Sequence, residues 1–397
     1  MKKNAKGILT GSHNFNGNQA CAEGAIAAGC RFLGVYPIVP ALEVSERFLD
    51  RAKDVEATYI QMEDEISSLA AVIGASWTGK KSMTVTSGQG LSLMMEHLGL
   101  GVMLETPCVI VDVQILGPGL GMPSRAAQGD VMQARWGSHG DYEVIAIAPA
   151  NPQEMFDFTI KAFNLSERYR VPVIVLSDEY LAHKKGKVII PKSDDIEIEP
   201  RRYFDGPKDS YLPFKRDKDM IPRMVDIGQG YKFHVTGLTH DDRGYPIMNE
   251  VYQEYNVHPL VKKIRDNTEK IVDIEEMHTE DADVLVVSYG TSYIAALKAI
   301  GQARKLGIKV GSLKLNTVWP FPDKLIAKYS KKVKGFVVPE MNFGQIVYEV
   351  ERCTYGNANV FFVPRGEKGI ENTDNILAAI GQAKKEKKVK DRIIESN

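Results

Sequence analysis

Cysteine is scarce in this chain. Its 397 residues include four cysteines, Cys21, Cys30, Cys108 and Cys353, and no two of them are closer than nine residues. Zinc and iron-sulfur sites commonly use the CxxC spacing, so no such site is expected in this chain. The cysteines stand in apolar contexts such as GCRFLG and PCVIVDV, where a free cysteine behaves as a small hydrophobic residue. Disulfides are therefore not expected.

The chain also lacks an excess of charge and a long apolar run. Lys and Arg total 50 and Asp and Glu total 51, which gives a formal net charge of -1. Proteins that bind nucleic acid or anionic membranes carry broad basic surfaces, so neither kind of partner is expected. No run of about 18 apolar residues occurs, and no apolar stretch follows the basic N-terminus. The sequence therefore predicts a soluble, cytoplasmic protein.

The composition is that of a globular α/β protein. Hydrophobic residues make up 44% and charged residues 25% of the chain, which is close to the globular average. From residue 17 to about 185, short apolar runs alternate with helical patterns. Strands joined by such helices run parallel and are covered on both faces. The expected strands lie at residues 31–38, 82–86, 108–113, 143–147 and 172–176.

Two further regions follow. Residues 191–280 are rich in proline and charge, and contain one expected strand at 231–236 and one expected helix at 249–271. A second α/β region begins near residue 281, where an apolar strand runs into a glycine turn. The fold class predicted is therefore α/β, with two mostly parallel-sheet domains, residues 1–190 and 281–397, joined by an irregular linker at 191–280.

Two glycine-rich stretches are candidate ligand loops. Gly117-Pro-Gly-Leu-Gly follows a strand, but its spacing and its prolines do not fit a dinucleotide-binding fingerprint. Ser87-Gly-Gln-Gly90 fits a strand-to-helix turn better, because its glycines let backbone amides approach a ligand at a helix N-terminus. On spacing alone, however, a tight turn without any ligand is the favoured interpretation.

A carboxylate cluster, Glu63-Asp-Glu65, stands where a strand gives way to an apolar helix. Acidic residues in a first helical turn commonly serve as caps and dipole partners. Glu65 borders the apolar stripe at the carboxyl end of a strand, where open α/β sheets bind ligands, so its pKa could be raised and its proton shared with a ligand. His139 lacks neighbours at metal-ligand spacing, and no metal site is predicted.

Several motifs in order along the chain resemble the alpha subunit of 2-oxoacid:ferredoxin oxidoreductases, with the 2-oxoglutarate type as the nearest subtype. The resemblance covers both α/β regions, and the ordered set is more specific than any single motif. The motifs are Gly17-Asn-Gln-Ala-Cys-Ala-Glu-Gly, Tyr36-Pro-Ile-Val-Pro, Gln61-Met-Glu-Asp-Glu, Thr86-Ser-Gly-Gln-Gly, Val111-Asp-Val-Gln, Val318-Trp-Pro-Phe-Pro and Pro339-Glu-Met-Asn-Phe-Gly-Gln.

The resemblance implies a thiamine diphosphate enzyme of anaerobic metabolism that converts a 2-oxoacid and coenzyme A to an acyl-CoA and passes electrons to ferredoxin. Residues 1–190 would form the pyrimidine-binding domain, and 281–397 a domain like the C-terminal domain of transketolases. Glu65 aligns with the carboxylate that hydrogen-bonds the aminopyrimidine ring, and Gly88, Gln89 and Gly90 would line the cofactor cleft.

The resemblance also implies partners. The magnesium-diphosphate motif of thiamine enzymes, GDG followed by a distant Asn, is absent from the sequence, as are clustered cysteines. A beta subunit would therefore supply the magnesium site and an iron-sulfur cluster, and gamma and ferredoxin-like delta subunits could join the complex. The chain alone should be inactive.

The sequence departs from the family at the expected substrate pocket. Val39 replaces the usual threonine of the Tyr-Pro-Ile-Thr-Pro motif, and Ile115 replaces the usual arginine after Gln114. These changes favour a branched or aromatic 2-oxoacid over 2-oxoglutarate, because a buried carboxylate without partners costs several kcal/mol. Arg125 could compensate. Two other functions stay open: a non-redox thiamine diphosphate transferase or decarboxylase subunit, and a scaffold subunit with a decayed pocket.

Overall fold

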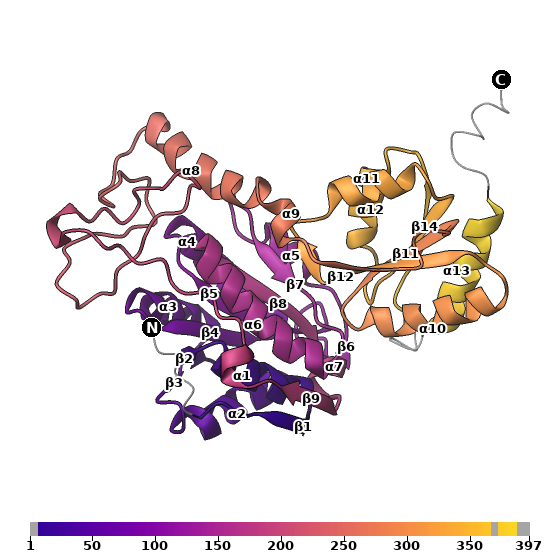
Figure 1. Ribbon diagram of the computed structural model, residues 1–397, viewed down its shortest axis with the longest axis horizontal. Helices are drawn as coiled ribbons and strands as arrows, with labels where there is room; N and C mark the ends of the chain where they lie inside the picture. The colour runs from indigo at the N-terminus through magenta and orange to yellow at the C-terminus, as the bar shows by residue number, and fades with distance from the viewer. Residues whose placement is uncertain (1–6, 367–371, 387–397) are drawn as a thin grey trace.

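The computed structural model of the chain describes residues 7–366 and 372–386. Its strands form two main sheets and one small two-stranded sheet. Figure 1 shows the two main sheets lying next to each other along the long axis, with an irregular segment beside the first of them. Most strand pairs in both main sheets are parallel, so the predicted α/β class is confirmed.

The first sheet has eight strands. Seven follow the order β13-β7-β8-β5-β4-β2-β3, and β6 pairs with β5 outside this path. Only the β13–β7 and β5–β6 pairs of this sheet are antiparallel. The strands are β2 (Cys30–Val35), β3 (Thr58–Gln61), β4 (Lys81–Thr86), β5 (Cys108–Leu116), β6 (Met122–Ala126), β7 (Ile145–Ile147), β8 (Pro172–Asp178) and β13 (Thr317–Trp319).

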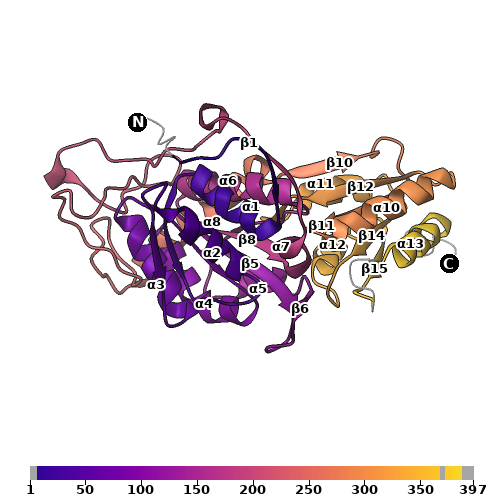
Figure 2. The same ribbon diagram turned by 90° about the horizontal axis from the view of Figure 1, so that it is seen from below.

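Helices cover both faces of this sheet. Figure 2 shows α1 and α6 on one side of the central strands and α3 and α4 on the other. The Asn151 side chain accepts a hydrogen bond from the backbone N–H of Glu154 at 3.0 Å and so caps the start of α6. The helices are α1 (Gly17–Ala27), α2 (Leu42–Ala52), α3 (Glu65–Trp77), α4 (Gln89–Met103), α5 (Val131–Trp136), α6 (Pro152–Tyr169) and α7 (Glu179–His183).

Strand β9 (Gly186–Ile190) pairs with β1 (Gly11–Phe15). The segment that follows β9 has little regular structure before residue 250. It contains short 3-10 turns at Ser193–Asp195 and Lys208–Ser210. The strand predicted at 231–236 is wrong: Phe233 packs against the rings of Trp77 and Tyr211, and side-chain packing replaces a strand ladder there. The helix predicted at 249–271 is broken into α8 (Glu250–Arg265) and α9 (Thr268–Ile271).

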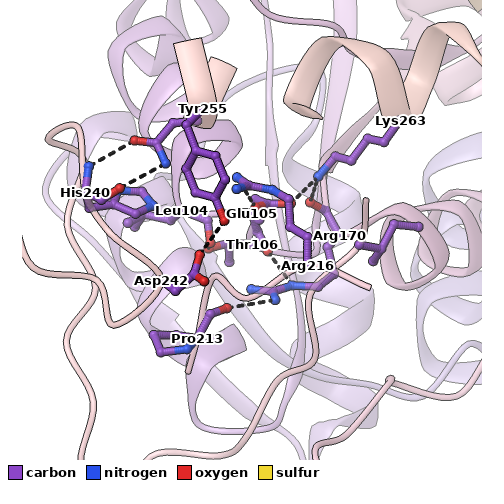
Figure 3. Close-up of polar contacts among 12 residues, drawn as sticks. Leu104, Glu105, Thr106, Arg170, Pro213, Arg216, His240, Asp242, Tyr255 and Lys263 are labelled. Atoms are coloured by element: carbon purple, nitrogen blue, oxygen red, sulfur yellow. Dashed lines mark hydrogen bonds and ion pairs between the residues drawn. The ribbon is translucent and has the colours of Figure 1, made fainter. Parts of the chain in front are cut away.

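A buried charge cluster fastens this segment to the first sheet region (Figure 3). Glu105 follows the C-terminus of α4, and its carboxylate lies 2.8 Å from Lys263 Nζ of α8 and 2.9 Å from Arg216 Nη2 of the irregular segment. Arg170, at the end of α6, donates through Nε to the Glu105 carbonyl at 2.9 Å. The cluster therefore joins three parts of the chain that lie far apart in the sequence.

The second sheet has the order β10-β12-β11-β14-β15, with only β10 antiparallel to its neighbour. The strands are β10 (Ile274–Met277), β11 (Val284–Tyr289), β12 (Val310–Leu315), β14 (Gly335–Pro339) and β15 (Asn359–Val363). The helices are α10 (Ser292–Lys305), α11 (Asp323–Ser330), α12 (Ile346–Thr354) and α13 (Thr373–Lys385).

Among the described residues, no helix combines the length and hydrophobicity needed to cross a bilayer.

Candidate functional site

Glu65 is the first residue of α3 and follows the carboxyl end of β3. The Asp64 side chain caps the helix by accepting a hydrogen bond from the backbone N–H of Ser67 at 2.7 Å. Asp64 thus does the capping, and the Glu65 carboxyl is left for another role. Glu65 is only 4% exposed. Burial raises the pKa of its carboxyl, and the negative charge of Asp64 raises it further.

Gly90 lies directly against the Glu65 carboxyl. A Cβ atom at Gly90 would stand 2.5 Å from Glu65 Oε1 and 2.0 Å from Thr86 Oγ1. Real Cβ atoms do not approach oxygen so closely, so only glycine fits in the first turn of α4 at this place. The start of α4 therefore lies against the start of α3, and the two expected site residues are in contact.

Gly88 stands just before α4 with a positive φ of 39°, which favours glycine. A Cβ atom at Gly88 would lie 3.3 Å from Ile115 Cγ1 near the end of β5. Gln89, between the two glycines, has a buried Oε1 atom without a hydrogen-bond donor in the described part of the chain. Glu65, Gly88, Gly90 and Ile115 thus form one continuous group at the carboxyl edge of the sheet.

The other two expected substrate residues stand on exposed parts of the chain. Val39 is 57% exposed, and the peptide bond to Pro40 is cis. Arg125 is exposed on β6. Burial raises the pKa of the Glu179 carboxyl at the start of α7, and the nearby positive charge of Arg125 lowers it by a smaller amount. No described contact joins either residue to Glu65 or to Gly90.

Sequence reasoning missed a pair of buried carboxyls beneath the Gly88 turn. Asp112 lies in the middle of β5 and is fully buried, and neither of its carboxylate oxygens is in hydrogen-bond geometry with a described donor. Burial, then repulsion from Asp130, raises the pKa of Asp112 well above its ordinary value. Burial raises the pKa of Asp130 to about 6. Asp112 could have been recognised from the sequence, because it is a charged residue inside the apolar run VIVDV.

The motif Pro339-Glu-Met-Asn-Phe-Gly-Gln holds the two sheet regions together. The backbone N–H of Gln128 donates to the Met341 carbonyl at 3.0 Å, and Gln128 Oε1 accepts from the Met341 N–H at 3.1 Å. Gln345 Oε1 accepts from the backbone N–H of Met132 at 2.8 Å. Residues 127–130 connect β6 to α5, so this docking fixes the loop that carries Asp130.

Two other regions carry no part of this group. The loop at residues 117–121 is the turn of the β5–β6 hairpin and does not open a helix. His139 is exposed, with its ring 3.7 Å from Glu96 of α4. Across residues 7–366 and 372–386, no three His, Cys, Asp or Glu side chains converge as metal ligands.

A hollow of about 1080 Å³ lies between α5, α9 and α11, and Glu65 is not part of its lining. Its apolar lining includes Trp136, Trp319 and Phe321. Most charged side chains at its rim are paired within the chain, such as Arg265 with Glu143 at 2.7 Å and Lys324 with Glu269 at 2.8 Å. Lys328 of α11 differs, because its Nζ lies 5.6 Å from the ring centroid of Tyr329 and forms no ion pair with a described residue.

Two family models match the chain. The model described as pyruvate flavodoxin/ferredoxin oxidoreductase, thiamine diphosphate-binding, matches residues 23–257, which include the whole Glu65 group. The model of pyruvate:ferredoxin oxidoreductase core domain II matches residues 282–371.

Curated relatives match over nearly the full chain. The 2-oxoglutarate synthase subunit KorA of Methanothermobacter marburgensis is 48% identical over 373 residues, covering 94% of this chain and 99% of the relative. The subunit of the same name from Methanocaldococcus jannaschii is 52% identical over 349 residues, covering 88% and 93%. The ketoisovalerate oxidoreductase subunit VorB of Methanothermobacter marburgensis is 34% identical over 340 residues, covering 85% and 88%.

Solved structures share the fold. A 2-oxoglutarate:ferredoxin oxidoreductase from Magnetococcus marinus, solved with 2-oxoglutarate, coenzyme A and succinyl-CoA bound, is 32% identical with a TM-score of 0.88. The match covers 95% of this chain and 66% of that one. A split-gene transketolase, an inactive beta4 tetramer, matches at 13% identity with a TM-score of 0.54 over 94% of this chain and 99% of that one, and indicates the fold alone.

Proposed function

Because this chain belongs to the 2-oxoacid:ferredoxin oxidoreductase family as an alpha subunit, we propose that it forms the half-site for the aminopyrimidine ring of thiamine diphosphate. Glu65 is the proposed catalytic carboxyl, and Gly88, Gln89 and Gly90 are proposed to line the cofactor. The contact between the Glu65 carboxyl and Gly90 carries this proposal. Since glycine has no side chain, the start of α4 can approach a ligand closely beside that carboxyl.

The environment of Glu65 suits proton sharing with a ring nitrogen. Its pKa is raised chiefly by burial, so its carboxyl holds a proton more readily than an exposed one. When bound, thiamine diphosphate supplies the carbon nucleophile that attacks the 2-oxoacid. In this proposal Glu65 holds a proton at the ring nitrogen and thereby favours the tautomer that can take the proton of the thiazolium carbon.

A beta subunit is proposed to close the other side of the site. Several apolar side chains are exposed in the segments that follow β2 and β5 and in the first two turns of α3 and α4. They are Tyr36, Val39, Ile66, Leu93, Leu120 and Met122, each between 39% and 72% exposed. Exposed apolar side chains gathered at one edge are typical of a protein interface. A partner bound there would complete the cofactor cleft and shield it from water.

The partner is proposed to supply the metal and redox groups. The four cysteines of this chain are all buried and unpaired, and they do not form a cluster-binding set. We propose that the beta subunit holds magnesium with the diphosphate and an iron-sulfur cluster, with gamma and ferredoxin-like delta subunits as further partners. The complex would convert a 2-oxoacid and coenzyme A to an acyl-CoA and carbon dioxide, and pass two electrons to ferredoxin. This subunit would be inactive alone.

Two substrate classes have support. The 48% and 52% identical relatives are named 2-oxoglutarate synthase subunits, and we propose 2-oxoglutarate as the substrate on that basis. The second candidate is a branched-chain 2-oxoacid. It is favoured by the apolar Val39 and by Ile115, whose side chain is 3% exposed beside Gly88.

Purification of the chain together with its beta subunit tests the function. A brown complex that contains thiamine diphosphate and reduces ferredoxin in the presence of a 2-oxoacid and coenzyme A would support the proposal. A colourless thiamine-containing complex would instead indicate the non-redox transferase or decarboxylase. A complex without thiamine would indicate a scaffold subunit.

A further inference from the structure

Thr86 is the first residue of the motif Thr86-Ser-Gly-Gln-Gly, but the proposed mechanism gives its side chain no role. It is the last residue of β4 and is fully buried. Its Oγ1 atom has no hydrogen-bond partner in the described part of the chain. A buried hydroxyl without a partner is unfavourable, so such an atom calls for an explanation.

The position of this hydroxyl is informative. Thr86 Oγ1 and Glu65 Oε1 lie 2.0 Å and 2.5 Å from the point where a Gly90 Cβ would stand. The hydroxyl and the carboxyl therefore approach the same face of Gly90, one from the strand and one from the start of α3. Besides the residue's own backbone, no described group donates a hydrogen bond to the Glu65 carboxyl.

We propose that Thr86 is a positioning residue: its hydroxyl donates a hydrogen bond to the Glu65 carboxyl when the cofactor ring is bound, and so fixes that carboxyl in the orientation needed to reach the ring nitrogen. The inference rests on the proposed role of Glu65. Both oxygens lie within 2.5 Å of the same point beside Gly90, where glycine places no side chain between them, so the hydroxyl is within reach of the carboxyl.

The alternative is that Thr86 only fills space. In that case Thr86→Val is neutral or stabilising, because valine has nearly the same shape and removes an unpaired buried hydroxyl. A donor to the Glu65 carboxyl acts differently. It favours the charged form of the carboxyl, so its loss raises the pKa of Glu65.

The chain offers a matched control in Thr84. Thr84 lies two residues earlier in β4, so its side chain is on the same face of the sheet. It is also fully buried, and its Oγ1 atom also has no described partner. Thr84→Val makes the same chemical change as Thr86→Val away from Gly90 and Glu65.

The experiment uses the complex with the beta subunit loaded with thiamine diphosphate, and measures hydrogen-deuterium exchange at the thiazolium carbon against pH. Thr86→Val should slow exchange about tenfold, which corresponds to about 1.4 kcal/mol. It should also shift the midpoint of the curve of exchange rate against pH to higher pH. Thr86→Ser should restore most of the rate, and Thr84→Val should match the wild type.

Exchange in Thr86→Val within about twofold of wild type, or an equal loss in Thr84→Val, would overturn the proposal. Glu65→Gln separates the two hypotheses: if it abolishes exchange while Thr86→Val does not, only the Thr86 proposal fails, and if it exchanges at the wild-type rate, the Glu65 assignment fails as well. A crystal structure of the loaded wild-type complex decides the matter without a variant. We expect Thr86 Oγ1 about 2.7 Å from a Glu65 oxygen, and a separation above about 3.5 Å would contradict the proposal.

Discussion

Lys263 and Glu105 form an ion pair of 2.8 Å although 158 residues separate them in the sequence, and both side chains are fully buried. Burial alone would raise the pKa of Glu105, but Lys263, followed by Arg216 and Arg170, lowers it below its ordinary value. Figure 3 shows these positive groups reaching Glu105 from separate elements. The pair therefore anchors α8 to the end of α4, and Arg216 anchors the irregular segment there.

Removal of one member of this pair should be strongly destabilising. Lys263→Met leaves a buried carboxylate with one ion partner fewer, and breaking a buried pair typically costs about 3 kcal/mol or more. Urea unfolding at neutral pH measures the loss. Lys262→Met is the control, because Lys262 is partly exposed and its neighbour Asp266 is 3.9 Å away. Equal stabilities of the two variants would show that the buried pair contributes little.

The same pair predicts that the free energy of unfolding depends on pH in the acidic range. Because the pKa of Glu105 is lower in the folded protein than in the unfolded chain, its stabilising effect is present above pH about 4.5 and is lost as the pH falls through the folded value. The difference in unfolding free energy between wild type and Glu105→Gln should therefore shrink below pH about 4.5. A difference that stays constant down to pH 3 would contradict this interpretation.

Glu65→Gln should abolish proton exchange at the thiazolium carbon without loss of folding or assembly. The amide has the same size as the carboxyl but cannot share its proton with the ring nitrogen. Exchange is followed by NMR on the thiamine-loaded complex, and assembly by gel filtration. Glu63→Gln is the matched control, because Glu63 is exposed two residues away. Exchange in Glu65→Gln at the wild-type rate would remove Glu65 from the mechanism.

Two glycines should respond oppositely to the same substitution. Gly90→Ala would force a Cβ atom against Thr86 Oγ1 and Glu65 Oε1, so it should destabilise the protein and weaken cofactor binding in the complex. Gly74→Ala in α3 should stabilise by about 0.5–1 kcal/mol, because no atom lies within 4 Å of the new Cβ and alanine favours helix. Calorimetric melting of both variants tests this. A Gly90→Ala protein as stable as wild type would mean that the close approach is relieved at no cost.

The buried acid pair predicts stabilisation by a neutral substitution. The pKa of Asp130 is raised to about 6 in the folded protein by burial, so folding becomes less favourable as the pH rises from about 4 to 6. Asp130→Asn cannot ionise and should raise the melting temperature at pH 7.5 more than at pH 4. The stabilisation is on the order of 1–3 kcal/mol. An equal change at both pH values would show that ionisation of the pair is not the cause.

Much of the fold follows from local patterns. Apolar runs such as 108–113 and 172–176 form strands where predicted, because buried parallel strands need continuous apolar side chains on both faces. β13 was not predicted, because three residues carry no periodic signal and its pairing with β7 comes from the packing of distant regions. The strand predicted at 231–236 failed for a similar reason: an alternating pattern does not supply a neighbouring strand.

The candidate site shows the same limit. The carboxyl at Glu65 and the glycine turn could be found from the sequence, because each marks the end of a strand. Their contact at Gly90, and the hydroxyl of Thr86 beside them, depend on how α3 and α4 pack together. Asp112 was visible as a charged residue in an apolar strand, but its partner Asp130 comes from a loop fixed by docking of the second sheet region.

Substrate choice can be tested through Arg125. If Ile115 lines the substrate pocket as proposed, the second carboxylate of 2-oxoglutarate needs a cationic partner there, and Arg125 on β6 is the nearest candidate in sequence. Arg125→Met should then lower kcat/KM for 2-oxoglutarate about 10- to 100-fold, because a hydrogen bond to a charged group contributes about 1.5–3 kcal/mol. The same variant should leave kcat/KM for 3-methyl-2-oxobutanoate nearly unchanged, since that acid has no second carboxylate. A wild-type complex that prefers 3-methyl-2-oxobutanoate tenfold would instead support the apolar pocket of Val39 and Ile115.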